Sequence, residues 1–320
     1  MKSLTERMDR TFENLFYSMG NIILEYMKNQ DIFEIILNPD GKLWVYTFSK
    51  GKVDTGSVLE EDKSKQIIYS IAAISDQIIA EEYPILEAEV PATSEFDSFR
   101  FNGILPGVVT APSFNIRKHP KIVLTLDDYV AQGVITSHQK DLIIAEIYAK
   151  KNIIIAGSTG SGKTTFVNAI LAEIAKLTDR IVLIEDTKEL NCMAKDFVSL
   201  TTTKTVDMVA LLRTTLRMSP KRIVVGEVRN EEALTLLDAW STGHKGGCCT
   251  IHSDSAYDAL LRLETLTSRT SANPQQITIG RAVDVVIYIE YTGLKRKVSE
   301  IMRVKGYDPL KQEYITDQAA

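Results

Sequence analysis

Cysteine is scarce in this sequence, and long apolar runs are absent from it. Three cysteines occur in 320 residues, one alone and two adjacent, so there is no disulfide framework and no C-x-x-C pair. The longest apolar runs, such as NIIIAG and RIVVG, have the length of a strand and fall far short of the ~20 residues that a membrane helix needs. These absences favour a cytoplasmic protein whose membrane association, if it has one, is peripheral.

An excess of positive charge is also missing. The net charge is −5 and the isoelectric point is about 5.6, so the chain as a whole does not attract nucleic acid or anionic lipid. Hydrophobic residues make up 44% and charged residues 25%, as in soluble globular proteins. A chain of 320 residues is long enough for two domains with separate cores.

The first part of the chain predicts an α+β domain over residues 1–118. Apolar positions recur at helical spacing in residues 1–30, and a second helical pattern covers residues 61–80. Between them, the NPDG turn of residues 38–41 separates two apolar runs and predicts a hairpin. Residues 84–118 are strand-like and interrupted by prolines.

The pattern changes in the second part of the chain. Residues 119–139 are mixed and are predicted to be a linker that includes a first helix. Residues 140–320 alternate short apolar strands with helical segments, which predicts an α/β domain with a mostly parallel, helix-covered sheet. The predicted strands are Ile153–Ala156, Ile181–Ile184, Ile223–Val225 and Cys248–Ile251, and the helices are Thr164–Lys176, Val206–Met218 and Glu231–Trp240. Residues 283–316 predict a few further strands.

The segment GSTGSGKT, residues 157–164, matches G-x-x-x-x-G-K-[ST] in full and lies between a predicted strand and a predicted helix. Glycines let successive backbone N–H groups face phosphate oxygens, and the helix N-terminus adds partial positive charge. Lys163 is expected to reach the β- and γ-phosphates of ATP, and the Thr164 hydroxyl to hold Mg²⁺. The predicted nucleotide-binding residues are Gly157, Ser158, Thr159, Gly160, Ser161, Gly162, Lys163, Thr164 and Thr165.

Hydrolysis needs a group that orients or deprotonates water, and two strand ends supply carboxylates. Glu185 and Asp186 follow one apolar run, with Glu189 close behind, and Glu227 follows another, with Arg229 two residues later. Ligands of open α/β sheets bind at the carboxyl ends of strands, so both positions face the predicted site. We expect Glu185 to act on the water; Glu227 is the second choice and the candidate Mg²⁺ contact through water.

The stretch STGHKGGCCTIHSDSA, residues 241–256, places His244, Cys248, Cys249 and His252 within nine residues, a grouping that suggests zinc. A zinc site needs four ligands that converge on one ion. The two glycines before CCTIH indicate a turn that enters a strand, where adjacent side chains point to opposite faces. Because the two cysteines would then point apart, we expect them to be buried strand residues rather than zinc ligands.

Taken in order, these segments resemble the secretion, or traffic, ATPases, P-loop NTPases of the GspE/PulE-like superfamily. The family's Walker A box resembles GSTGSGKT, its Asp box IEDTKEL, its Glu-ending Walker B box RIVVGEVR and its His box TGHKGGCCTIHSDSA. Over nearly the whole chain, segments such as FRFNGILPGVVTAPSFNIRK resemble the TrbB-type conjugal-transfer ATPases, relatives of the VirB-type ATPase of type IV secretion. Lys221 and Asn230 depart from the usual motif without removing a group that the chemistry needs.

The resemblance implies a RecA-like ATPase domain and a homo-hexamer that powers conjugal DNA transfer or type IV secretion. It implies partners among the inner-membrane components of such a machine, and a location in the cytoplasm at the inner face of that membrane. Arg100 and Arg117 resemble the N-terminal-domain arginines that contact nucleotide phosphates. His244 and His252 would sense the γ-phosphate or transmit its loss to a neighbouring subunit.

Three other functions remain open at this point. One is a nucleotide-gated scaffold that hydrolyses ATP slowly, although the complete acidic set argues against it. Another is a DNA-translocating RecA-like motor, but the acidic isoelectric point and the lack of a basic, aromatic-interleaved loop predict no specific nucleic-acid binding. A P-loop kinase is the third, and no lid or acceptor signature supports it.

Overall fold

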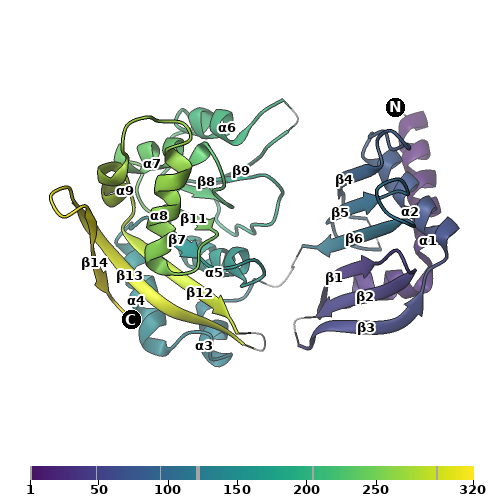
Figure 1. Cartoon of the computed structure of the whole chain (residues 1–320), viewed down its shortest axis with the longest axis horizontal. Helices are drawn as coiled ribbons and strands as arrows, with labels where there is room; N and C mark the ends of the chain where they lie inside the picture. The colour runs from purple at the N-terminus through teal and green to yellow at the C-terminus, as the bar shows by residue number, and fades with distance from the viewer. Residues whose placement is uncertain (1, 48, 94, 120–122, 204, 293–294) are drawn as a thin grey trace. The chain divides into compact units, whose positions relative to one another are not determined.

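The chain divides into two compact units, residues 1–121 and residues 122–320. This computed structural model describes residues 2–47, 49–93, 95–119, 123–203, 205–292 and 295–320, and of residues 2–9 the backbone alone (Figure 1). In this described part, no helix is both long enough and apolar enough to span a bilayer.

The first unit is a sheet with two helices packed on it. Among its described residues, the strand order is β3-β2-β1-β6-β5-β4, and every neighbouring pair is antiparallel. The predicted hairpin is confirmed, because β1 and β2 flank the NPDG turn. The elements are α1 (Lys2–Lys28), β1 (Ile32–Leu37), β2 (Lys42–Thr47), β3 (Gly51–Val58), α2 (Glu61–Ile74), β4 (Ile85–Val90), β5 (Phe99–Ile104) and β6 (Ser113–Lys118).

Only one face of this sheet is buried. Ile35, Ile116 and Phe101 lie opposite one another across three strands, are fully buried and share a core with residues of α1 and α2. The residues that precede or follow them in the strands point to the other face, because side chains alternate along a strand. That face carries a cross-strand row of charges: Glu34, Arg117, Arg100 and Glu89.

The second unit is built on a sheet with the order β14-β13-β12-β7-β11-β10-β8-β9 in its described part. The strands from β12 to β9 run parallel, and β13 and β14 add an antiparallel edge. The strands are β7 (Ile153–Ala156), β8 (Ile181–Glu185), β9 (Phe197–Thr201), β10 (Arg222–Val225), β11 (Cys248–Ile251), β12 (Val285–Tyr291), β13 (Arg296–Asp308) and β14 (Glu313–Gln318).

Helices cover both faces of this sheet, as the alternating pattern predicted (Figure 1). Side chains of α6, α7, α8 and α9 form one core with the sheet, and side chains of α3, α4 and α5 form the other. The four residues of β7 are buried because the strand is central and covered twice. The helices are α3 (Leu126–Ala131), α4 (Ser137–Tyr148), α5 (Lys163–Ile174), α6 (Met208–Thr215), α7 (Glu232–Ser241), α8 (Ala256–Thr267) and α9 (Gln276–Ala282).

The domain boundary differs from the predicted one. Residues 119–139 were expected to be a linker that includes a first helix; α3 and the start of α4 lie in this range and pack into the second unit. Thr125 and Thr136 cap these two helices with reciprocal capping boxes, so short polar residues mark helix starts where the sequence suggested a connection. Residues 120–122 lie outside the described part of the chain.

Candidate nucleotide-binding and catalytic site

The loop between β7 and α5 requires glycine at three positions. Gly157, Gly160 and Gly162 have φ angles of 155°, 76° and 94°, which side chains rarely tolerate. A Cβ on Gly157 would also lie 2.3 Å from the carbonyl oxygen of Ile289 and 2.7 Å from Ser161 Oγ. The strand, loop and helix therefore have the arrangement that the sequence motif predicted.

The polar groups of this loop suit a phosphate. Gly162 is the N-cap of α5 and provides no side chain to the first-turn amides, whose partial positive charge favours an anion. Ser161 Oγ is buried and has no hydrogen-bond partner in the described part of the chain. Thr164 and Thr165 follow in the first turn of α5, half-buried, and Ser158 and Thr159 are exposed at the loop. These residues fit a nucleotide phosphate, and the role of Thr164 as an Mg²⁺ ligand stays a prediction.

The ammonium group of Lys163 is held inside the loop. Its Nζ donates to the carbonyl oxygens of Gly157 at 3.0 Å and Ser158 at 2.8 Å, and it lies 3.2 Å from Nδ1 of His252. The lysine is buried, with 7% of its surface exposed. A buried ammonium needs such acceptors, and phosphate oxygens would be stronger ones.

His252 lies between Lys163 and Glu227. An ammonium has no acceptor, so the Nδ1 that faces Lys163 carries no proton, and the ring proton of the neutral histidine is on Nε2. That Nε2 lies 2.9 Å from Oε1 of Glu227. Burial lowers the pKa of His252, and the charge of Lys163 lowers it further, while Glu227 opposes this shift. At neutral pH the histidine is therefore neutral and lies between a cation and an anion, close to Glu227 Oε1 but without a hydrogen bond to it.

Glu227 follows β10 and is a stable anion. Burial raises its pKa, but the hydrogen bond and charge of Arg229, together with His252 and Lys163, outweigh burial and lower it. Nη2 of Arg229 donates to Oε2 of Glu227 at 2.5 Å. An ionised carboxylate one histidine away from the loop lysine is suitably placed to bind a metal-bound water.

Glu185 is the last residue of β8 and is buried, with 2% of its surface exposed. Its Oε1 accepts hydrogen bonds from the backbone N–H groups of Glu189 at 2.9 Å and Leu190 at 2.8 Å. Two amide donors stabilise the ionised carboxylate and fix its position. A side chain on Gly226 would press on Glu185, because a Cβ there would lie 3.2 Å from Glu185 Cγ.

The structure also brings Arg296, which the sequence did not single out, to the phosphate loop. Its Nη2 lies 3.5 Å from the carbonyl oxygen of Gly160, and a Cβ on Gly162 would lie 3.2 Å from its Cδ. Arg296 is 134 positions after Gly162 in the chain and carries no motif. Only the sheet order, in which β12 and β13 follow β7, places it at the loop.

The two histidines of the predicted His box lie at opposite ends of β11. His252 follows the carboxyl end of this strand, beside the loop, whereas His244 precedes its amino end and contacts the carbonyl oxygen of Ala239 at 3.3 Å. Within one chain only His252 lies beside the loop, and the predicted role of the two histidines, to sense the γ-phosphate or transmit its loss to a neighbouring subunit, stays a prediction. The four residues of β11 separate the two histidines. Ligands of parallel sheets bind at the carboxyl ends of the strands, and only His252 lies at that end.

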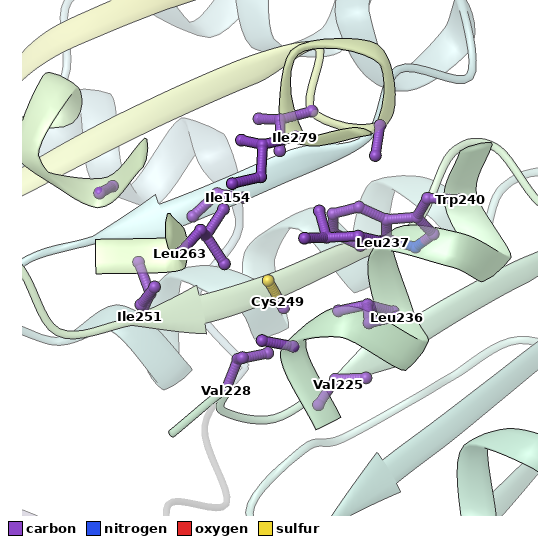
Figure 2. Close-up of a cluster of buried hydrophobic side chains, with 14 of the residues drawn as sticks. Ile154, Val225, Val228, Leu236, Leu237, Trp240, Cys249, Ile251, Leu263 and Ile279 are labelled. Atoms are coloured by element: carbon purple, nitrogen blue, oxygen red, sulfur yellow. The ribbon is translucent and has the colours of Figure 1, made fainter. Parts of the chain in front are cut away.

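Cys248 and Cys249 point to opposite faces of the sheet, as predicted. Cys249 packs in the core on the side of α6 to α9, next to Ile251, Leu237 and Trp240 (Figure 2), and Cys248 packs in the other core. Burial raises the pKa of Cys248 to about 12 and raises that of Cys249 well above its usual value. Neither thiol has the exposure or charge of a zinc-binding thiolate.

The first unit holds the two other predicted phosphate ligands. Arg100 on β5 and Arg117 on β6 are paired directly across the sheet, on the face opposite to the core. Arg100 is half-buried and Arg117 is exposed. The two guanidinium groups thus share one open face of the sheet, and their role toward nucleotide stays a prediction.

Comparison with known proteins identifies the family. Residues 32–299 match the family described as Type II/IV secretion system protein. The chain belongs to this family. It is 43% identical to the conjugal transfer protein TrbB of Rhizobium radiobacter over 93% of this chain and 91% of the relative. A probable TrbB of Sinorhizobium fredii is 41% identical over 97% and 94%.

The fold has solved counterparts too. The ATPase DotB of Legionella pneumophila matches 90% of this chain and 80% of its own, with a TM-score of 0.61 and 18% identity. The predicted fold class is thereby confirmed, as is the resemblance to conjugal-transfer and secretion proteins of the TrbB type. The family therefore groups this chain with proteins of conjugation and secretion. The geometry of the loop between β7 and α5 suits the binding of a nucleotide phosphate.

Proposed function

We propose that this protein hydrolyses ATP as a hexameric traffic ATPase that powers conjugal DNA transfer or type IV secretion from the cytoplasmic side of the inner membrane. The gathering of the loop lysine, His252 and Glu227 is the observation that carries the proposal, since it brings a carboxylate close to the phosphate-binding loop. The likeness to TrbB supports the choice of biological process.

In this mechanism Lys163 leaves the loop carbonyls and binds the β- and γ-phosphates. Thr164, and Glu227 through water, would hold Mg²⁺, whose charge offsets that of the phosphates. Glu185, whose Oε1 is held by two backbone amides, orients or deprotonates the attacking water. Glu227 is the second candidate for that role.

Phosphate state is converted into motion in two places. When Lys163 turns to phosphate, His252 loses its Nδ1 contact, so the loop following β11 senses occupancy of the site. Arg100 and Arg117 are the second, because their guanidinium groups would bind the phosphates in one nucleotide state and release them in another. The role proposed for His244 is to transmit the loss of the γ-phosphate to a neighbouring subunit.

The direct test is ATPase activity with Mg²⁺, measured beside the mass of the assembly with and without Mg-ATP. Wild type should form a hexamer that turns over, and Lys163→Ala should lose the activity while keeping its thermal stability. Wild-type turnover in Lys163→Ala would sink the assignment. ATP binding by a hexamer with negligible turnover, even with partner proteins added, would favour a nucleotide-gated scaffold. Tight, salt-dependent DNA binding would favour a DNA-translocating motor.

A further inference from the structure

Arg296 is the first residue of β13, and its cross-strand partner is Tyr291, the last residue of β12. The guanidinium carbon lies 5.5 Å from the centroid of the Tyr291 ring. Contact with an aromatic ring limits the directions that the guanidinium can take. The side chain is therefore directed to the phosphate loop by its own hairpin.

The side from which Arg296 approaches the phosphate loop indicates what it could bind. A Cβ on Gly162 would lie 3.2 Å from Cδ and 3.3 Å from Nε of Arg296, so the arginine occupies the side of Gly162 that lacks a side chain. Glycines in phosphate-binding loops leave that side open so that a phosphate can approach the backbone. Arg296 consequently lies where its charge would meet the incoming anion.

At this position the guanidinium of Arg296 has N–H donors that are only weakly engaged in hydrogen bonds. Its Nε is buried and makes no hydrogen bond in the described part of the chain, and its Nη2 contact to Gly160 is long at 3.5 Å. A planar fork with weakly used donors suits a phosphate oxygen.

Sheet order indicates which phosphate this is. β7 lies between β11, which leads to His252, and β12, which leads to Arg296. Lys163, His252 and Glu227, which the proposed function assigns to the β- and γ-phosphates and to Mg²⁺, lie together on the β11 side. Arg296 reaches the loop from the other side, where the rest of the nucleotide must extend.

We propose that Arg296 binds the α- or β-phosphate of the nucleotide, as a phosphate ligand supplied by the second unit itself. This inference rests on the proposed function, because it assumes that the loop binds a nucleotide. A contact to the α- or β-phosphate is shared by ATP and ADP, whereas a γ-phosphate contact would affect ATP alone.

The experiment measures the affinities of ATP and ADP, with Mg²⁺ and without turnover, for wild type, Arg296→Gln, Arg296→Lys and Lys297→Gln. Arg296→Gln should weaken both nucleotides by an equal factor of about ten or more, the loss expected for a charge-assisted hydrogen bond. Arg296→Lys should recover part of the affinity for both. Lys297 is the exposed neighbour on β13, and Lys297→Gln should match wild type.

Each outcome has a separate meaning. If wild type binds neither nucleotide, the proposed function fails. If wild type binds and Arg296→Gln binds equally well, this inference alone fails. Loss confined to ATP would place Arg296 at the γ-phosphate and overturn the assignment. Thermal melting without nucleotide tests for a merely structural role. If Arg296→Gln lowers the melting temperature and Arg296→Lys does not restore nucleotide affinity, the role of Arg296 is structural and the inference fails.

Discussion

The two ends of β11 both carry polar and charged residues, but these residues differ in their burial and in their partners. At the carboxyl end, His252 is 41% exposed and lies between groups that a ligand would rearrange, Lys163 and Glu227. At the amino end, Asn152 and Arg222 are buried and hydrogen-bonded. Asn152 is completely buried, and its Oδ1 accepts from the backbone N–H groups of Gly246 at 2.8 Å and Gly247 at 3.2 Å.

Arg222 completes the amino end. It is 1% exposed and donates to Asp179 at 2.8 Å, to the Gly246 carbonyl at 2.9 Å and to the Ile147 carbonyl at 3.1 Å. Gly247 is required for a related reason, since a Cβ there would lie 2.1 Å from the carbonyl oxygen of Ile223. Satisfied buried networks hold a structure in place, whereas exposed charges with exchangeable partners respond to ligands. We infer that the amino end anchors β11 in the fold, and that the carboxyl end, called the working end below, carries the groups that respond to a ligand.

The strongest test of the working end compares its two carboxylates. Glu185→Gln keeps the size of the side chain but removes the charge, so turnover should fall by about a thousandfold if Glu185 acts on the water. Glu227→Gln should mainly raise the Mg²⁺ concentration needed for activity. Full turnover in Glu185→Gln beside a dead Glu227→Gln would exchange the two roles. Nucleotide affinity serves as the control for folding.

The amino end should respond in stability rather than in chemistry. Arg222→Met removes one partner of a buried ion pair and three hydrogen bonds, so we expect a loss of about 3 kcal/mol in the free energy of unfolding. Denaturant unfolding measures it, and Lys221→Met, at the exposed preceding residue, should change stability by less than about 0.5 kcal/mol. Equal effects in both variants would mean that Arg222 does not anchor β11.

The histidines compare the two ends directly. His252→Asn should lower turnover at saturating ATP by about tenfold, because the imidazole between Lys163 and Glu227 is lost. His244→Asn should leave ATP affinity within about twofold of wild type, as expected for a substitution that touches no ligand. If His244→Asn lost turnover but not affinity, His244 would act across a subunit boundary, and the difference between the ends would hold only within one chain.

Much of this arrangement could be predicted from local patterns in the sequence. The strands Ile153–Ala156 and Cys248–Ile251 match β7 and β11 in their bounds, because short apolar runs between turn signals are unambiguous. The phosphate loop followed from spacing alone. The edge strand β9 was not predicted, since its burial is partial and its pattern weak.

Long-range placement could not be derived in the same way. The predicted bounds of β11 already placed His244 before the strand and His252 after it, but only the sheet shows which end of the strand lies beside the phosphate loop. Arg296 reaches the loop through sheet order, and Asn152 and Arg222 form a network through contacts distant in sequence. Single-sequence patterns describe neighbours along the chain, whereas these residues meet across it.

The smallest expected effect concerns the cysteines between the two ends. The raised pKa values keep the thiols of Cys248 and Cys249 protonated at pH 8, and burial excludes reagents, so a thiol reagent should not label them in the folded protein. Cys192 is half-buried, and its raised pKa predicts slow labelling. In Cys192→Ala, labelling should therefore appear only on unfolding. Rapid labelling of the folded variant, or one bound zinc per chain that disappears in Cys248→Ser, would return this stretch to metal chemistry and end the division between a fixed and a working end of β11.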